Sequence, residues 1–410
     1  MIDSWKESLD ELYSQMVEWR RDFHMNPELS FEEVRTPQKI ADYLSNLGIE
    51  VKTGVGGRGV VGIIRGGKPG RTIALRADFD ALPIQDEKNV PYKSTVPGVM
   101  HACGHDGHTA TLLGVAKILS ENREYLHGNV VLLHQHAEEK APGGAIAMVE
   151  DGALDGVDVV FGTHLMANAP YGTYSYRKGP MMAAVDAFVI TIQGRGGHGS
   201  APHETVDAIA IGTQVVNQLQ HIVARQINPL RPAVVSVGSF HAGGAPNVIA
   251  DTAEITGTVR TFDPEVRDRI ENEMKTIVQG ICAAFHATCE VEYSRGYPAL
   301  VNHDKETDVF VEVMSKQVGE EKLVNIEPIM GSEDFGYFIQ NKPGMFFFTS
   351  AGNEEIGACY PHHHPKFDFD ERAMILAGQA LLSITHHYLC EQPSKDENFD
   401  EHADIELMTT

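Results

Sequence analysis

Residues 74–109 bring together the side chains that divalent metals prefer, in a segment that opens as an apolar strand and ends in a glycine-rich turn. A thiolate, two imidazoles and carboxylates at such a turn are the ligands of a soft-to-borderline divalent metal. We therefore interpret the segment as half of a metal site. Its candidate residues are Asp78, Asp80, Cys103, His105, Asp106 and His108.

The other ligands must come from elsewhere, because Cys103 and His105 cannot fill four positions and a catalytic site also keeps one position open. Three later places offer them, each at or beyond a predicted strand end, where an open α/β sheet keeps its chemistry. The first is His134 with His136, Glu138 and Glu139; the second is His164; the third is the triple histidine His362, His363 and His364. Adjacent Glu138 and Glu139 could divide the work, one binding metal and the other taking a proton from water.

The elements that must position these residues alternate between helix and strand up to about residue 163. Apolar spacing predicts helices over residues 5–23, 37–47 and 109–119. Runs of apolar and β-branched residues predict strands over 50–55, 60–64, 72–75, 129–134 and 157–164. This alternation predicts an α/β fold with a mixed sheet flanked by helices.

Around residue 181 the pattern changes to strand, helix, two strands, helix and strand. The predicted ranges are 187–192, 205–223, 234–240, 253–259, 264–285 and 288–293. This order is a split βαβ unit of ferredoxin-like α+β type, inserted into the first domain. The predicted domains are a catalytic domain over 1–182 and 296–390, an inserted domain over 183–295 and an acidic, disordered tail over 391–410.

Composition excludes several classes of protein. The 410 residues carry a net charge of −24, which argues against nucleic-acid binding, because that depends on clustered Lys and Arg. No apolar run is long enough for a membrane span, and the first residues lack the order of a signal peptide, so we expect a cytoplasmic protein. Five cysteines at irregular spacing do not suggest a disulfide framework.

A set of motifs in fixed order gives the chain a family resemblance that covers about residues 10–389. The motifs are RADFDALP, MHACGHDGHTA, HAEEKAPGGA, FGTHL, GGHGSAPH, APNVIAD, GSEDFGYF and HHPKFDFDE. Together they resemble the amidohydrolase subfamily of the aminoacylase and carboxypeptidase-G type metallopeptidases. That group includes hippurate hydrolases, N-acyl-amino-acid amidohydrolases, N-acetyl-diaminopimelate deacetylases and plant auxin-conjugate hydrolases.

The resemblance implies a zinc-peptidase-like catalytic domain interrupted by a lid that also forms a homodimer. Two divalent ions are implied, zinc or manganese, with cobalt or nickel also compatible, and Glu138 is the implied general base. The implied metal ligands are Cys103, which bridges the two ions, and His105, Glu139, His164 and His363. Asp78, Asp80 and Asp106 are expected to support the ligands, together with His101 and His108, while His198 and Asn247 bind the scissile carbonyl and Arg260 the substrate carboxylate.

Two positions depart from the family pattern. His136 stands where many relatives have proline, and Pro361-His362 replaces the usual residues before the ligand histidine, so His362 and His364 stay alternatives to His363. The expected substrates are small N-acetyl or N-benzoyl amino acids, with N-acetyl-diaminopimelate as an alternative. A non-catalytic metal-binding homodimer and a cysteine hydrolase with Cys103 as nucleophile are the competing interpretations.

Overall fold

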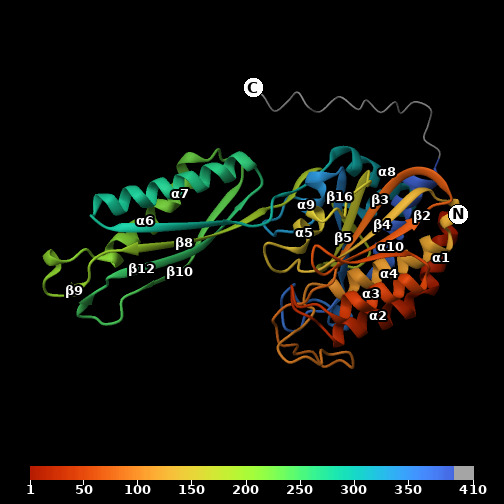
Figure 1. The fold of residues 1–410 in the computed structure, drawn as a ribbon, viewed down its shortest axis with the longest axis horizontal. Coiled ribbons are helices and arrows are strands. Elements are labelled where there is room, and N and C mark those ends of the chain that lie inside the picture. The colour runs from red at the N-terminus through yellow and green to blue at the C-terminus, as the bar shows by residue number, and fades with distance from the viewer. Residues whose placement is uncertain (392–410) are drawn as a thin grey trace, which may run out of the picture.

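The computed structural model describes residues 1–391, so the predicted acidic tail lies, apart from Glu391, outside the described residues. An eight-stranded mixed sheet forms the larger part of the molecule, on the right of Figure 1, in the order β1-β2-β4-β3-β5-β16-β6-β15. The strands are β1 (Glu50–Val55), β2 (Gly59–Arg65), β3 (Lys68–Asp78), β4 (His127–Gln135), β5 (Val159–Pro170), β6 (Tyr174–Tyr176), β15 (Leu323–Asn325) and β16 (Gly344–Gly352).

The four central strands, β4, β3, β5 and β16, run parallel to one another. Their carboxyl ends therefore meet at one edge of the sheet, where an open α/β fold keeps its ligands. The strands are apolar along most of their length because both faces are covered: every residue of β16 up to Ala351 is buried. This sheet confirms the predicted mixed α/β fold.

Helices cover both faces of the large sheet and give it two apolar cores. One face carries α1 (Ile2–Glu11), α2 (Tyr13–Met25), α3 (Arg35–Asn46), α4 (His105–Glu121), α8 (Asp304–Val318) and α10 (Ala373–Cys390). The other face carries α5 (Gly144–Glu150) and α9 (Gly336–Asn341). Within residues 1–391 no helix combines the length and the apolar character needed to cross a membrane.

The helix predicted over residues 5–23 is two helices, so that prediction is wrong in one respect. The Leu12 N–H donates to the Leu9 carbonyl at 3.0 Å, a tight turn that ends α1 before α2 begins. The two helices then differ in their main partner: α1 packs mostly against α10 and also touches α4, while α2 packs against α4. Helical spacing of apolar residues predicts one straight helix with one apolar face. The spacing alone does not show that the chain turns at Leu12, so that the apolar residues before and after it face different directions.

The second unit, on the left of Figure 1, is an antiparallel sheet in the order β10-β12-β8-β13 with α6 and α7 packed on one face. Its elements are β8 (Ala184–Gln193), β9 (Gly197–His198), α6 (Ala208–His221), β10 (Ala233–Ala242), β11 (Val248–Ile249), β12 (Thr252–Thr261), α7 (Pro264–Ala284) and β13 (Thr288–Arg295). This order matches the ferredoxin-like unit predicted from the sequence. Short strands β7 (Gly179–Met182) and β14 (Leu300–Asn302) pair beside the crossing between the two units, whose domain limits stay predictions.

Candidate active site

The strand ends at the carboxyl edge deliver the predicted metal ligands to one place. Strand β3 ends at Asp78, and the chain returns to this edge through the loop that carries Cys103 into α4. Gly104, with φ of 100°, lets the chain turn so that His105 begins the helix. Strand β5 contributes His164 from its buried stretch.

Two histidines have the ring orientation that a metal ligand needs. The Nδ1 atom of His105 lies 3.0 Å from the Asp80 carbonyl and 3.1 Å from its carboxylate, and Nδ1 of His164 lies 3.0 Å from the Leu165 carbonyl. Because these oxygens only accept, the proton of each neutral ring sits on Nδ1 and the lone pair on Nε2. Burial also lowers the pKa of His164 well below its usual value, so its ring is neutral.

The sulfur of Cys103 lies at the centre of two potential metal-binding groups. One is Cys103, His105 and Glu139; the other is Cys103, His164 and His362. Within residues 1–391, His105 Nε2 and Glu139 Oε1 are both buried without a hydrogen-bond partner, and they lie 3.8 Å apart. Two orphaned ligand atoms facing each other beside a buried thiol fit a metal ion at this place.

The loop after β16 places two members of the triple histidine beside this group. Its backbone is tied to the ligand loop, since the His363 N–H donates to the Ala102 carbonyl at 2.8 Å. His363 Nε2 lies 3.3 Å from Glu139 Oε2, and His362 Nδ1 lies 3.6 Å from the Cys103 sulfur. His364 stacks on Tyr360 instead, with 4.6 Å between ring centroids.

Glu138 lies beside the ligands but faces other acids as well. Its Oε2 is 3.8 Å from His105 Nε2, and it shares a group with Glu333 and Asp334. Burial, followed by the charges of Glu333 and Glu139, raises the pKa of Glu138 well above its usual value. A carboxyl group with a raised pKa can hold and release a proton near neutral pH, as a general acid and base must.

The charge that balances these acids is Arg76, which the sequence interpretation missed. Its guanidinium donates to Asp78 at 2.7 Å, to Glu333 at 2.9 Å, to Asp334 at 3.0 Å and to Gln135 at 2.8 Å. An arginine inside the apolar strand β3 was the available signal, because arginine is almost never fully buried unless it is paired. Asp78 in turn accepts from His108 Nδ1 at 2.6 Å, so its carboxylate is held by two partners.

Asp80 contacts two of the candidate ligands, His105 and Glu139. One carboxylate oxygen lies 3.1 Å from His105, and the other accepts from the Glu139 N–H at 2.9 Å and from the Ser30 hydroxyl at 2.6 Å. One carboxylate thereby fixes a candidate histidine ligand and a candidate carboxylate ligand relative to each other.

A cavity of about 410 Å³ opens over these groups and reaches the second unit. Its lining combines the cluster, an apolar wall and one cation, Arg260. The cluster side is formed by Cys103, Glu138, Glu139, His164, Glu333, His362 and His363, and the opposite wall by Met166, Met182, Tyr297, Ile329, Gly331, Ser332 and Phe348. The methionines, Ile329 and Tyr297 had not been predicted, because they come from separate segments that only the fold brings together.

Three other candidates lie away from the cluster. Asp106 faces the opposite way, where it pairs with Arg20 at 2.8 Å and with His24 at 2.7 Å, so it does not touch the ligands. Both ring nitrogens of His101 are buried and have no hydrogen-bond partner among the described residues, and His136 packs edge-on against Phe31.

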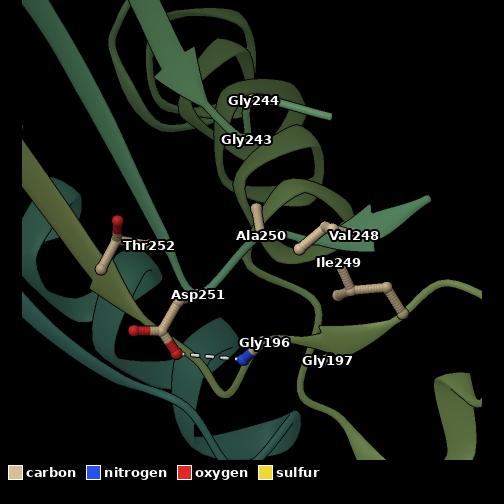
Figure 2. Close-up of a pocket in the computed structure, with 9 residues that line it drawn as sticks. All are labelled: Gly196, Gly197, Gly243, Gly244, Val248, Ile249, Ala250, Asp251 and Thr252. Atoms are coloured by element: carbon tan, nitrogen blue, oxygen red, sulfur yellow. Dashed lines mark hydrogen bonds between the residues drawn. The ribbon is translucent and has the colours of Figure 1, made fainter. Parts of the chain in front are cut away.

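His198 and Asn247 lie together in the second unit, near a shallow glycine-lined pocket at its outer end. His198 in β9 pairs with Val248 in β11, and the Gly199 N–H donates to the Asn247 carbonyl at 2.8 Å. Figure 2 shows the pocket, in which Asp251 accepts a hydrogen bond from the Gly196 N–H at 3.0 Å. Because β9 lies at the end of the unit farthest from the large sheet (Figure 1), this chain does not bring His198 to its own cluster.

His198 is nevertheless set up as a hydrogen-bond donor. Its Nδ1 accepts from the Ser200 N–H at 3.1 Å, with the Ser200 hydroxyl 2.8 Å away. In the neutral ring the proton therefore sits on Nε2, which is free to donate.

Comparisons with known proteins show which chains this one is similar to. An amidohydrolase of Bacillus subtilis, named YhaA, is 54% identical over 385 residues, which are 93% of this chain and 97% of that protein. An N-acyl-L-amino acid amidohydrolase of Geobacillus stearothermophilus is 49% identical and covers 73% of this chain and 81% of its own length.

Among solved structures, the Bacillus subtilis YXEP protein, described as a dinuclear metal binding peptidase from M20 family, superimposes with a TM-score of 0.80 at 36% identity. It covers 92% of this chain and 98% of its own. The sequence model of peptidase family M20/M25/M40 matches residues 74–386. The resemblance predicted from the motifs is thereby confirmed, and the chain belongs to peptidase family M20/M25/M40.

Proposed function

We propose that this enzyme is a metal-dependent amidohydrolase that cleaves the amide bond of small N-acyl amino acids, with Glu138 as general base. One observation carries the proposal: Glu138, the candidate metal ligands and the cation Arg260 line the same cavity of about 410 Å³. Such a cavity has the size of a small-molecule site, and its polar groups are few and convergent. The family relatives named above carry amide hydrolysis in their names.

The residues present fit two divalent ions, and the Cys103 sulfur would be a ligand for them. His105 and Glu139 would hold one, with His363 beside Glu139, and His164 would hold the other. Thiolate and imidazole ligands favour zinc, while the carboxylate also admits manganese. When bound, such ions lower the pKa of water and polarise a carbonyl group.

The proton path follows from the position of Glu138. Its carboxylate takes a proton as water attacks the scissile carbonyl and later delivers that proton to the leaving amine nitrogen. The backbone around it is held in place, because the Tyr297 hydroxyl donates to the Glu138 carbonyl at 2.6 Å. Glu333 and Asp334 pair with Arg76 beside Glu138, and their negative charges help to raise the pKa of Glu138.

A cysteine nucleophile is disfavoured by the same surroundings. Burial, followed by the charges of Glu139 and Glu138, raises the pKa of the Cys103 thiol well above its usual value. A nucleophilic cysteine needs the opposite, a lowered pKa that keeps it as thiolate. A bound cation would reverse the effect and stabilise the thiolate as a ligand.

The cavity walls suggest the substrate. Arg260 is the one Lys or Arg in the described lining, so it can pair with one carboxylate. The apolar wall of Met166, Met182, Ile329 and Phe348 suits an apolar acyl group or side chain. This favours a substrate with one carboxylate over N-acetyl-diaminopimelate, which carries a second charged end.

The position of His198 supports a homodimer. We infer that the second units of two chains pair, so that His198 of one chain donates to the scissile carbonyl in the cavity of the other. A mixture of Glu138→Gln and His198→Ala chains tests this. Random pairing places one intact site in half of the dimers, so about a quarter of the wild-type activity should return. A monomeric mass, or no recovery in proven mixed dimers, would refute the arrangement.

Hydrolysis of N-acetyl and N-benzoyl amino acids by the purified protein tests the function itself. We expect activity that is lost after chelation and restored by zinc or manganese. Activity indifferent to chelator would indicate Cys103 as nucleophile, and metal binding without turnover of any substrate would favour the non-catalytic homodimer.

A further inference from the structure

The backbone of strand β5 determines which nitrogen carries the proton in three histidine rings, those of the buried His108 and His164 and of the half-buried His362. As described above, the Leu165 carbonyl accepts from Nδ1 of His164 and leaves the Nε2 lone pair facing the Cys103 sulfur at 3.3 Å. The N–H groups of Leu165 and Ala167 have the opposite effect on the rings they contact, because a donor requires a lone pair, not a proton, on the ring nitrogen. The Leu165 N–H donates to Nε2 of His108 at 2.9 Å.

His362 follows the pattern of His108, not that of His164. The Ala167 N–H donates to His362 Nε2 at 3.3 Å, so the lone pair of the ring is on Nε2. A neutral imidazole has one N–H, which must then be on Nδ1. That is the atom that faces the Cys103 sulfur at 3.6 Å, so a proton lies where a ligand would need a lone pair.

Packing holds the His362 ring in this orientation. It lies between His164, with 5.2 Å between ring centroids, and Phe367, at 4.8 Å. Turning the ring over would break the hydrogen bond from Ala167 and disturb both contacts. His363 differs, since its side chain is 52% exposed and its Nε2 faces the carboxylate of Glu139.

We propose that His362 is a hydrogen-bond donor to the Cys103 thiolate and not a metal ligand. The Nδ1–H group draws charge from the shared sulfur, which weakens its donation to both ions and leaves them stronger Lewis acids. His362 is thus a positioning residue that acts through Cys103. It also occupies one of the two positions where the sequence departs from the family pattern.

The inference rests on the proposed two-metal site. Substitution with Co²⁺ distinguishes the proposal that Cys103 is a metal ligand from the proposal that His362 donates a hydrogen bond to it. With Co²⁺ bound, a sulfur ligand gives a charge-transfer band in the near ultraviolet, whose energy rises when the sulfur accepts a hydrogen bond. A wild-type protein without this band would refute the thiolate ligation itself and, with it, the role of His362. The test compares the wild type with His362→Leu, which removes the donor, and His362→Gln, whose amide can restore one.

We expect the leucine variant to bind the same number of Co²⁺ ions as the wild type, with a charge-transfer band at longer wavelength. Any change in metal affinity should stay within the about 10–100-fold typical of outer partners. The glutamine variant should return the band toward the wild-type position. Loss of one Co²⁺ per chain in the leucine variant would show that His362 is a ligand, and an unchanged band would exclude the hydrogen bond.

A measurement on the wild type keeps the inference testable if the variants do not fold. In the metal-loaded protein with isotope-labelled histidine, NMR distinguishes a protonated nitrogen, a free lone pair and a metal-bound nitrogen. We expect the ring that contacts the Ala167 amide to show a proton on Nδ1 and no metal on either nitrogen. A metal-bound Nδ1, or a proton on Nε2, would overturn the assignment.

Discussion

Replacing Glu138 by glutamine tests the central chemical claim with the smallest change of shape. The amide keeps the volume of the carboxyl group and the backbone contact to Tyr297, but it cannot accept a proton from water. The neighbouring residue provides a matched control, because Glu139→Gln makes the same change to a candidate ligand. Within residues 1–391, Glu139 Oε1 is buried without a hydrogen-bond partner and lies 3.8 Å from His105 Nε2.

The expected loss follows from the role of each carboxylate. General acid–base catalysis contributes about 10²–10⁴-fold, or roughly 3–5 kcal/mol, so Glu138→Gln should lower kcat/KM by that factor and retain both metals. Glu139→Gln should lose metal, since an amide is a much weaker ligand than a carboxylate. Two adjacent and identical substitutions thus give opposite results for metal content.

Stability gives an independent check on Glu138. Burial and the neighbouring acids raise its pKa in the folded, metal-free protein above the value of 4.5 in the unfolded chain. The stability linked to its protonated form is therefore complete below about pH 4.5 and is lost as the pH rises through the raised pKa. Metal-free Glu138→Gln, which has no charge to bury, should be more stable than the wild type at pH 8.

Kinetics, metal analysis and thermal unfolding of the three proteins provide the test. Turnover of Glu138→Gln within a few-fold of the wild type would refute the general-base role. Equal loss of metal in both variants would refute the division of labour between the two carboxylates. A metal-free Glu138→Gln protein less stable than the wild type at pH 8 would show that the charge of Glu138 is compensated in the fold.

Three further changes probe other parts of the structure. Arg260→Met should lower kcat/KM about 10–150-fold for an N-acyl amino acid, because a charge-assisted hydrogen bond is worth about 1.5–3 kcal/mol. It should barely change kcat/KM for the corresponding N-acyl amino acid amide, which has no carboxylate. Equal losses for both substrates would show that Arg260 does not bind the carboxylate. Burial raises the pKa of Glu33 from 4.5 to about 7, so the stability linked to its protonated form is lost as the pH rises through 7. Glu33→Gln should therefore raise the free energy of unfolding by about 3 kcal/mol at pH 9 and change it little at pH 4.5, as denaturant titrations would show. Arg76→Met leaves three buried acids without their cation and should lower the free energy of unfolding by about 3–5 kcal/mol at pH 7. The loss should be smaller at low pH, where the acids are protonated, and a loss that does not change with pH would contradict this reasoning.

The sequence predicted the large sheet and most residues of the cluster, although not Glu333 or Arg76, because these features depend on local signals. Apolar runs predicted the strands that lead to Asp78 and His164, and glycines surrounded Cys103. The strand end predicted at residue 164 is wrong, because β5 continues to Pro170 and His164 lies within it. The antiparallel order of the second unit also followed from its sequence of elements. These features need only the alternation of elements and the rule that parallel strands end at the same edge.

Residues whose role depends on distant partners were harder to predict. Arg76 is explained by Glu333 and Asp334, more than 250 positions later, and no spacing in the sequence connects them. Asp106 shows the opposite error: it lies between two candidate ligands in the sequence, yet helix α4 turns it away from them toward Arg20. Sequence neighbours on a helix face different directions, so proximity in a motif does not establish a shared site.

The triple histidine shows most clearly where sequence information ends. Its members are identical side chains in consecutive positions, so residue type cannot distinguish a ligand from a neighbour. The backbone of β5 does: a carbonyl group fixes His164 with a free Nε2, while the Ala167 N–H fixes His362 with its proton toward the sulfur. The ring of His363 contacts neither of these two β5 backbone groups, and its Nε2 faces Glu139. The role of each ring is therefore set by whether a backbone donor or acceptor stands behind it, which depends on the register of a strand about 200 residues earlier in the chain.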